Sequence, residues 1–93
     1  LKLAHVNIQS VLNKRTELFN YISSEKIDIL SINETWLTNN KKFNLPNYEI
    51  IRQDRISKGG GVAIAIKKNI RNEIVIIPTD LAVECVAVKL PAA

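Results

Sequence analysis

The first third of the chain contains two short apolar runs separated by one amphipathic stretch. Residues 2–8 form a mostly apolar run of strand length, and residues 27–32 form a second one. Between them, residues 12–25 place apolar side chains on one side of a helix and charged side chains mostly on the other. The apolar positions of this helix are Leu12, Leu18, Phe19 and Ile22. This order of elements predicts a βαβ unit, whose two strands are parallel and joined by a right-handed crossover.

The rest of the chain predicts strands without intervening helices. Turn-forming residues around Thr38-Asn39-Asn40 and Pro46-Asn47 indicate an irregular loop. Four short strands are then predicted, over residues 48–52, 61–67, 73–77 and 82–90. Their short connections predict antiparallel hairpins, and the strand from Val62 to Ile66 is apolar on both faces, so other elements should cover both. These elements predict the α/β class, as one half of a layered sandwich with a mixed sheet.

Composition restricts the chain to one small domain. Its 93 residues are 46% hydrophobic, which excludes a disordered chain. No apolar run approaches the ~20 residues of a membrane span, no secretory signal is recognisable, and the single cysteine excludes an internal disulfide. A strand-like run begins at Leu1, and the chain stops just after another strand. We therefore expect the sequence to be an excerpt of a longer protein.

Basic side chains concentrate in the middle of the chain. Residues 40–71 carry eight basic and two acidic side chains, whereas the remainder carries five basic and seven acidic ones. A phosphate backbone would favour such a stretch, and within it Arg52, Arg55 and Lys58 are candidates for contacts with nucleic acid. The alternative is a solvated surface that serves solubility. The following Gly59-Gly60-Gly61 run leads into a strand rather than a helix, so it is interpreted equally well as a plain turn or as part of a basic loop.

One amide and one carboxylate are the strongest candidates for chemistry. Asn7 lies near the carboxyl end of the first strand, and Glu34 lies just past the carboxyl end of the second. If the strands are parallel neighbours, both side chains reach the same edge of the sheet, where open α/β sheets bind ligands. Oxygen ligands of this kind suit Mg²⁺. The alternative is a glutamate that caps a loop and an asparagine that holds a turn.

Other reactive side chains favour structural roles. His5 shares a strand face with Asn7 but has no second histidine and no metal-ligand spacing, so we expect an ordinary core or edge residue. Trp36 could stack on a base, but a tryptophan after a strand more often packs under a loop. Tyr48 is expected to be structural, and Cys85 a buried small hydrophobic residue.

Three ordered segments resemble one known family. They are Asn7-Ile8-Gln9-Ser10 with Asn13-Lys14; Asp28-Ile29-Leu30-Ser31-Ile32-Asn33-Glu34-Thr35-Trp36-Leu37; and Tyr48 followed by Arg52-Gln53-Asp54-Arg55 and Gly59-Gly60-Gly61-Val62-Ala63-Ile64. Their order and spacing resemble the N-terminal portion of the endonuclease/exonuclease/phosphatase superfamily. More narrowly, they resemble the apurinic-type endonuclease domain of non-LTR (LINE-like) retrotransposons, and the resemblance covers nearly the whole chain.

The resemblance implies a four-layer α/β sandwich and Mg²⁺-dependent phosphodiester hydrolysis, with Mn²⁺ as a possible substitute. Glu34 matches the metal-binding glutamate of the family, and Asn7 matches its active-site asparagine. The family's remaining catalytic residues, a tyrosine, an Asp-x-Asn pair and a closing Asp-His pair, come later and are absent. We therefore expect residues 1–93 to be a partial domain without its C-terminal half, inactive alone, with an exposed apolar face that involves residues 62–66 and 83–88.

The sequence thus predicts a fragment of a retrotransposon endonuclease that nicks target DNA and leaves a 3′-hydroxyl to prime reverse transcription. The expected partners are DNA and the missing half of the domain, with no membrane, and the expected location is intracellular with access to the nucleus. One alternative is a phosphatase, deadenylase or DNA-repair nuclease of the same fold, against which the block from Glu34 to Leu37 argues. The other is a non-catalytic remnant that only binds nucleic acid, which DNA binding at low salt would address.

Overall fold

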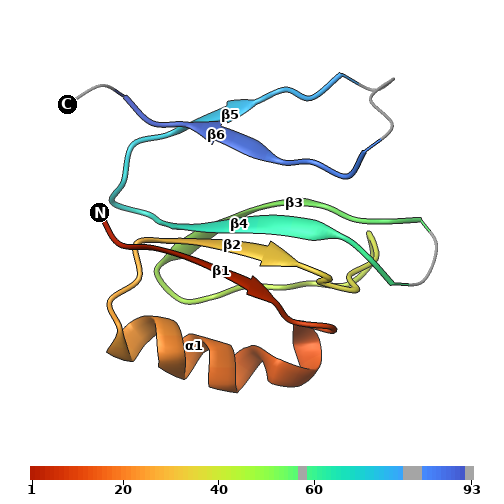
Figure 1. Cartoon of the computed structure of the whole chain (residues 1–93), viewed down its shortest axis with the longest axis horizontal. Helices are drawn as coiled ribbons and strands as arrows, with labels where there is room; N and C mark the ends of the chain where they lie inside the picture. Colours follow the sequence, from red (N-terminus) through yellow and green to blue (C-terminus); the bar gives the residue numbers. More distant parts are fainter. Residues whose placement is uncertain (57–58, 79–82, 92–93) are drawn as a thin grey trace.

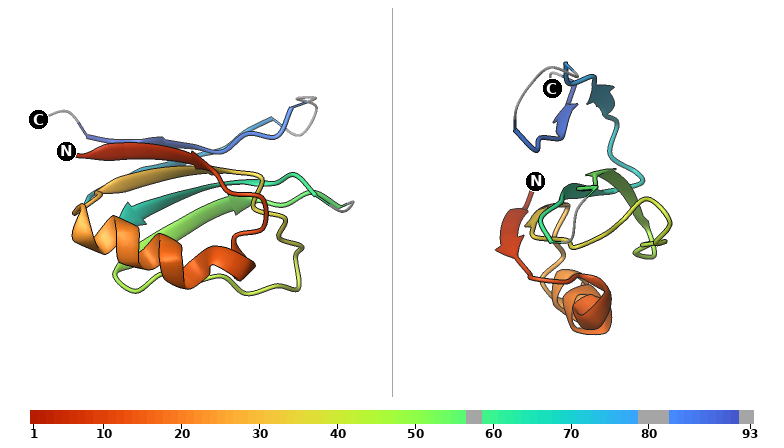
Figure 2. Two further views of the ribbon diagram at one scale, coloured as in Figure 1. Left: turned by 60° about the horizontal axis from the view of Figure 1, so that its bottom comes forward. Right: turned by 90° about the vertical axis from the view of Figure 1, so that its right-hand side faces the viewer.

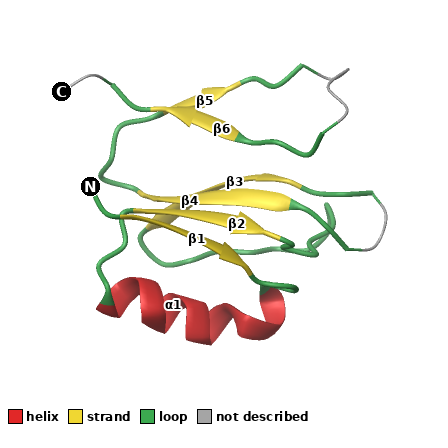
Figure 3. Cartoon of the chain, in the orientation of Figure 1, coloured by secondary structure: helices red, strands yellow, loops and turns green. Residues whose placement is uncertain are grey.

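The computed structural model describes residues 1–56, 59–78 and 83–91 as a four-stranded sheet, one helix and a separate two-stranded ribbon (Figures 1 and 3). The elements are β1 (Leu3–Asn7), a 3₁₀ turn η1 (Leu12–Lys14), α1 (Arg15–Ser24), β2 (Ile29–Asn33), β3 (Tyr48–Gln53), β4 (Val62–Lys67), β5 (Glu73–Val75) and β6 (Ala87–Lys89). In the part of the chain so described, no helix has the length and apolar character needed to cross a membrane.

The main sheet has the strand order β1-β2-β4-β3. Strands β1 and β2 are parallel, with Leu3 opposite Ile29 and Asn7 opposite Asn33, so the predicted βαβ unit is confirmed. Strand β4 runs antiparallel to both β2 and β3. The sheet is therefore mixed, as the sequence predicted, and its parallel pair aligns the carboxyl ends of β1 and β2.

Helix α1 is terminated by its own backbone rather than by a glycine. Lys26 adopts a left-handed φ of 53°. The N–H of Ile27 then donates to the Ile22 carbonyl at 2.9 Å, and the N–H of Lys26 donates to Ser23 at 3.3 Å. This is the Schellman pattern, which satisfies the last helical carbonyls. It brings Ile27 back onto buried Ile22 and so directs the chain into β2.

The expectation that successive strands form hairpins is correct for β3 with β4 and for β5 with β6, but wrong for β4 with β5. Strand β4 already has a partner on each side, so the chain leaves the sheet after it. The last two strands are also shorter than predicted. Pro78, which lacks an N–H, follows β5 closely. Ahead of β6, the N–H of Cys85 donates to the side-chain oxygen of Gln53 at 2.7 Å rather than to the backbone of a neighbouring strand. Ala82, where this strand was predicted to begin, lies outside the described residues.

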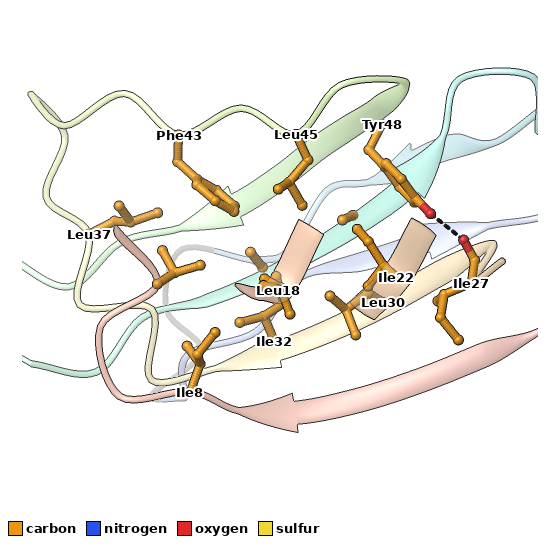
Figure 4. Close-up of a cluster of buried hydrophobic side chains, with 13 residues drawn as sticks. Ile8, Leu18, Ile22, Ile27, Leu30, Ile32, Leu37, Phe43, Leu45 and Tyr48 are labelled. Atoms are coloured by element: carbon orange, nitrogen blue, oxygen red, sulfur yellow. Dashed lines mark hydrogen bonds between the residues drawn. The ribbon is translucent and has the colours of Figure 1, made fainter. Parts of the chain in front are cut away.

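The molecule has three layers, with α1 against one face of the main sheet and the β5–β6 ribbon on the other side (Figure 2). The core lies between α1, the sheet and the loop that precedes β3 (Figure 4). Its fully or nearly buried members include Val11, Leu18, Ile22, Ile27, Leu30, Ile32, Leu37, Phe43, Leu45, Ala63 and Ala65. Burial of this continuous apolar cluster is the main source of stability.

The other face of the sheet is only partly covered. The expectation that other elements cover both faces of the strand from Val62 to Ile66 is therefore only partly correct. On this face Val62 and Ile64 are half-buried and Ile66 is buried, whereas the alternate positions Ala63 and Ala65 are both buried. The ribbon is itself poorly buried, since all three residues of β5 are exposed. Val83, in the range where we expected exposed apolar surface, is also exposed.

Tyr48 has a structural role, as predicted. Its ring is buried at the start of β3, and its hydroxyl donates to the Ile27 carbonyl (Figure 4). Burial raises the pKa of this phenol. The hydrogen bond satisfies a carbonyl that would otherwise be buried without a partner at the turn between α1 and β2.

Asp28 fastens three strands together at the end of the sheet opposite to the carboxyl ends of β1 and β2. Its Oδ2 accepts from the backbone N–H of Lys2 at 2.7 Å, and its own N–H donates to the Lys2 carbonyl at 2.9 Å. Its backbone carbonyl accepts from the N–H of Lys67 at 3.0 Å, and its carboxylate lies 3.5 Å from the Lys67 ammonium. The Lys2 N–H and, to a lesser extent, Lys67 hold the pKa of Asp28 below its usual value.

This lowered pKa predicts a loss of stability in acid. The carboxylate pKa is lower in the folded chain than in the unfolded chain, so its contribution is present above the unfolded pKa and disappears as the pH falls through the folded pKa. Urea unfolding between pH 2 and pH 7 should show Asp28→Asn less stable than the wild type at neutral pH, with the difference closing in acid. A pH-independent difference would contradict the role of this carboxylate.

Candidate metal centre and phosphate site

The carboxyl ends of β1 and β2 meet at one edge of the sheet. The register places Asn7 opposite Asn33, and Glu34 follows directly. Beyond the strands, the N–H of Ile8 donates to the Asn33 carbonyl at 3.1 Å, and the N–H of Ser10 donates to the Glu34 carbonyl at 3.0 Å. The two loops therefore run side by side, and they hold Asn7 and Glu34 against the same small cavity of about 110 Å³.

This cavity gathers polar side chains from four separate segments. It is lined by Asn7, Asn33, Glu34, Arg55, Gly60, Gly61, Val62 and Glu84. The described residues contain no group of three or more His, Cys, Asp or Glu side chains arranged to hold a metal ion. One carboxylate with amide oxygens nearby nevertheless fits Mg²⁺, which keeps several waters and takes few protein ligands.

Glu34 is held in a defined orientation by the chain's only tryptophan. The indole N–H of Trp36 donates to Oε2 of Glu34 at 2.8 Å. Both residues have left-handed backbones, with φ values of 59° for Glu34 and 56° for Trp36, so the intervening Thr35 is turned into the interior while they face outward. With one carboxylate oxygen engaged, the other remains for a cation. The expectation that Trp36 packs under a loop is wrong, because 44% of this residue is exposed.

The glycine run forms the turn that supports this loop. Gly59, Gly60 and Gly61 have φ values of 84°, 64° and 88°, which side chains other than glycine rarely adopt. The Gly60 carbonyl accepts from the N–H of Trp36 at 2.8 Å, and the Gly61 carbonyl accepts from the N–H of Thr35 at 3.3 Å. The run therefore forms a turn with a structural role, whereas contact of this loop with nucleic acid stays a prediction. The turn is part of the wall beside Glu34.

The three predicted phosphate contacts have different surroundings. Arg52 is engaged within the chain: its Nη2 donates to the Lys41 carbonyl at 2.7 Å and to the Thr38 carbonyl at 3.1 Å, and it pairs with Asp54 at 2.9 Å. It anchors the loop before β3 and does not line the cavity, so its contact with phosphate stays a prediction. Lys58 lies outside the described residues. Of the two that the structure describes, Arg55 lines the cavity and Arg52 does not.

Glu84 also lines the cavity, although no pattern in the sequence indicated it. Its Oε1 accepts from Nε of Arg55, and its Oε2 accepts from the N–H of Gly61 at 2.7 Å. The hydrogen bond from Arg55 first, and then that from Gly61, hold the pKa of Glu84 below its usual value. This acidic residue between β5 and β6 was visible in the sequence, but its partner lies 29 residues earlier.

His5 and Cys85 have no part in the cavity. Nδ1 of His5 lies 2.9 Å from the Ser31 hydroxyl on the neighbouring strand, in keeping with the expected role as an edge residue. His5 instead borders a separate hollow of about 400 Å³ between β1 and α1. Cys85 is half-buried rather than buried, as the segment that contains it crosses the outer face of β4 near Val62 and Ile64.

A mixed sheet whose aligned strand ends present an amide and an oriented carboxylate defines an α/β protein with a candidate site for a divalent cation. The model of the endonuclease/exonuclease/phosphatase family matches residues 4–93, and the chain belongs to this family. The four-stranded sheet and its helix correspond to the N-terminal part of that family's fold. No curated protein matches the chain significantly. The resemblance is thus confirmed for the superfamily, while the retrotransposon subtype stays a proposal.

Proposed function

We propose that the chain forms the metal-binding half of the active site of a Mg²⁺-dependent DNA endonuclease of the non-LTR retrotransposon type. Its product would be nicked DNA with a 3′-hydroxyl that primes reverse transcription. The observation that carries the proposal is the convergence of Asn7 and Glu34 on one cavity in a chain of this family. The motif from Glu34 to Leu37 and the glycine turn that supports it favour the retrotransposon subtype over a phosphatase, deadenylase or repair nuclease.

Three side chains of the cavity would have different roles in binding the cation and the phosphate. Glu34 would hold Mg²⁺, or Mn²⁺ in its place, through the carboxylate oxygen that Trp36 leaves free. Asn7, at the end of the neighbouring strand, would orient the bound phosphate with its amide. Arg55 supplies a positive charge at the same cavity. When bound, the cation stabilises negative charge that develops on the phosphate during attack by water.

Turnover needs further groups. The only histidine, His5, does not line the cavity and bonds to Ser31. The second carboxylate of the cavity, Glu84, has both oxygens engaged by Arg55 and Gly61, so the described residues offer no free general base beside Glu34. Activation of water would therefore fall to residues outside 1–93, at the positions where the family has a tyrosine, an Asp-x-Asn pair and an Asp-His pair. A DNA substrate in turn implies an intracellular protein with access to the nucleus.

Nicking of supercoiled plasmid DNA tests the function. A longer protein that carries this sequence followed by the missing catalytic residues should nick the plasmid with Mg²⁺ and not with EDTA. A DNA polymerase should extend the nicks, because they end in a 3′-hydroxyl. Hydrolysis of phosphate monoesters or of poly(A) without plasmid nicking would contradict the DNA endonuclease proposal and favour the alternatives of the same fold.

A further inference from the structure

Arg55 is held at the cavity by contacts on two sides. On one side, Nε donates to the Glu84 carboxylate. On the other, the guanidinium lies directly on the backbone of Gly60, where a Cβ would overlap Cζ, Nε and Nη2. The side chain remains 47% exposed. A flexible side chain on a loop is thus fixed in one place while part of its charged group still faces solvent.

Glu84 connects this arginine to the wall of the cavity. Its second oxygen accepts from the N–H of Gly61 at 2.7 Å, and the carbonyls of Gly60 and Gly61 hold the loop that carries Glu34. Arg55, Glu84 and Glu34 all line the same cavity. One carboxylate therefore ties the arginine to the turn that supports the candidate metal ligand.

We propose that Glu84 is a positioning residue that holds Arg55 at the Asn7–Glu34 cavity, where the guanidinium binds a DNA phosphate. The inference rests on the proposed function, since it takes a phosphodiester as the ligand. Glu84 has both oxygens occupied by donors of this chain and does not itself contact the phosphate. Its contribution lies in removing the conformational freedom that Arg55 would otherwise lose on binding.

Charge alone and positioning predict opposite effects for the same substitution. Glu84 is an anion beside a phosphate site, so neutralising it would strengthen DNA binding if only the electrostatic field mattered. If Glu84 positions Arg55, Glu84→Gln weakens binding, because the charge-assisted hydrogen bond that fixes the guanidinium is lost. Glu84→Asp separates the effects further, since it keeps the charge but is too short to reach both Arg55 and Gly61.

The experiment is a fluorescence-anisotropy titration of the 93-residue chain with a labelled DNA duplex in Mg²⁺ at several salt concentrations. Arg55→Gln should weaken binding and reduce the salt slope by about 1, as expected when one phosphate contact is lost. Glu84→Gln and Glu84→Asp should each weaken binding roughly three- to fivefold, in line with the weight of a partly exposed ion pair. Glu25→Gln, which neutralises an exposed carboxylate 3.3 Å from Lys2, is the matched control and should leave binding unchanged.

The double variant distinguishes positioning from a general structural role. In the Arg55→Gln background, Glu84→Gln should cause little further loss, because the residue it positions is already gone. Equal losses in both backgrounds would overturn the inference, as would tighter binding by Glu84→Gln alone. A wild-type chain that binds no DNA also overturns it, while Mg²⁺ binding at Glu34, measured without DNA, then decides separately whether the metal site stands.

Discussion

Replacing Glu34 with glutamine should abolish Mg²⁺ binding by the chain. Glutamine keeps the shape of the side chain and an oxygen that accepts from the Trp36 indole, but removes the negative charge that a divalent cation requires. Substitution of groups that only support a ligand weakens metal binding by about 10- to 100-fold, so loss of the ligand itself should exceed about 100-fold. Isothermal titration with Mg²⁺, or electron paramagnetic resonance with Mn²⁺, measures the change.

The single tryptophan gives a second measurement of the same site. Its indole N–H gives one resonance in a ¹H–¹⁵N spectrum, and that resonance should move when Mg²⁺ is added, because the proton is bonded to Glu34. In Glu34→Gln it should start at a different position and not respond. Glu49→Gln, an exposed carboxylate on β3 away from the cavity, is the control and should behave as the wild type does. Unchanged Mg²⁺ affinity in Glu34→Gln would contradict the assignment of Glu34 as the metal ligand.

Gly61→Ala should produce the largest loss of stability, about 2–4 kcal/mol. Two effects add at this position. The φ of 88° is strained for any residue with a Cβ, and the new Cβ would overlap the hydroxyl of Thr35, which is itself buried. Relief by rotation of the Thr35 side chain is costly, since its hydroxyl accepts from the N–H of Leu37 at 3.4 Å. Urea unfolding followed by circular dichroism measures the difference.

Gly59→Ala is the matched control for this substitution. Gly59 has a similar φ of 84°, but the nearest atom to its Cβ position is Nε1 of Trp36 at 4.0 Å. Gly59→Ala should therefore lower the free energy of unfolding only by the cost of a positive φ, about 1–2 kcal/mol. The double variant Gly61→Ala/Thr35→Ala should recover part of the steric loss. Equal destabilisation by Gly59→Ala and Gly61→Ala would show that the contact with Thr35 contributes nothing.

Features of the fold that depend on local periodicity could be predicted from the sequence. The spacing of Leu18 and Ile22 gave the buried face of α1, and the apolar runs on either side gave β1 and β2. The helical connection between these strands predicted that they pair in parallel. The parallel pairing was enough to predict that Asn7 and Glu34 lie at the same edge of the sheet. The family relation, recognised from ordered motifs, is confirmed by the match over residues 4–93.

Features that depend on contacts between distant segments could not be predicted. The pairing of Arg55 with Glu84 joins segments 29 residues apart, and no local pattern distinguishes Glu84 from other acidic residues. Arg52 looked equivalent to Arg55 in the basic stretch, but its guanidinium binds carbonyls of the preceding loop. The exposure of Trp36 depends on its left-handed backbone, which neighbouring residues in the sequence do not dictate.

Backbone strain in the described residues is concentrated in the loops of the candidate metal site. Six residues other than glycine have a positive φ, and four of them, Gln9, Ser10, Glu34 and Trp36, belong to the paired loops after β1 and β2. Each such residue costs of order 1–3 kcal/mol, which the surrounding packing must offset. A variant selected only for thermal tolerance would gain most by relaxing these loops, and would thereby lose the geometry at Glu34. Higher thermal stability and the geometry that a metal site needs therefore require different conformations of the same few peptide units.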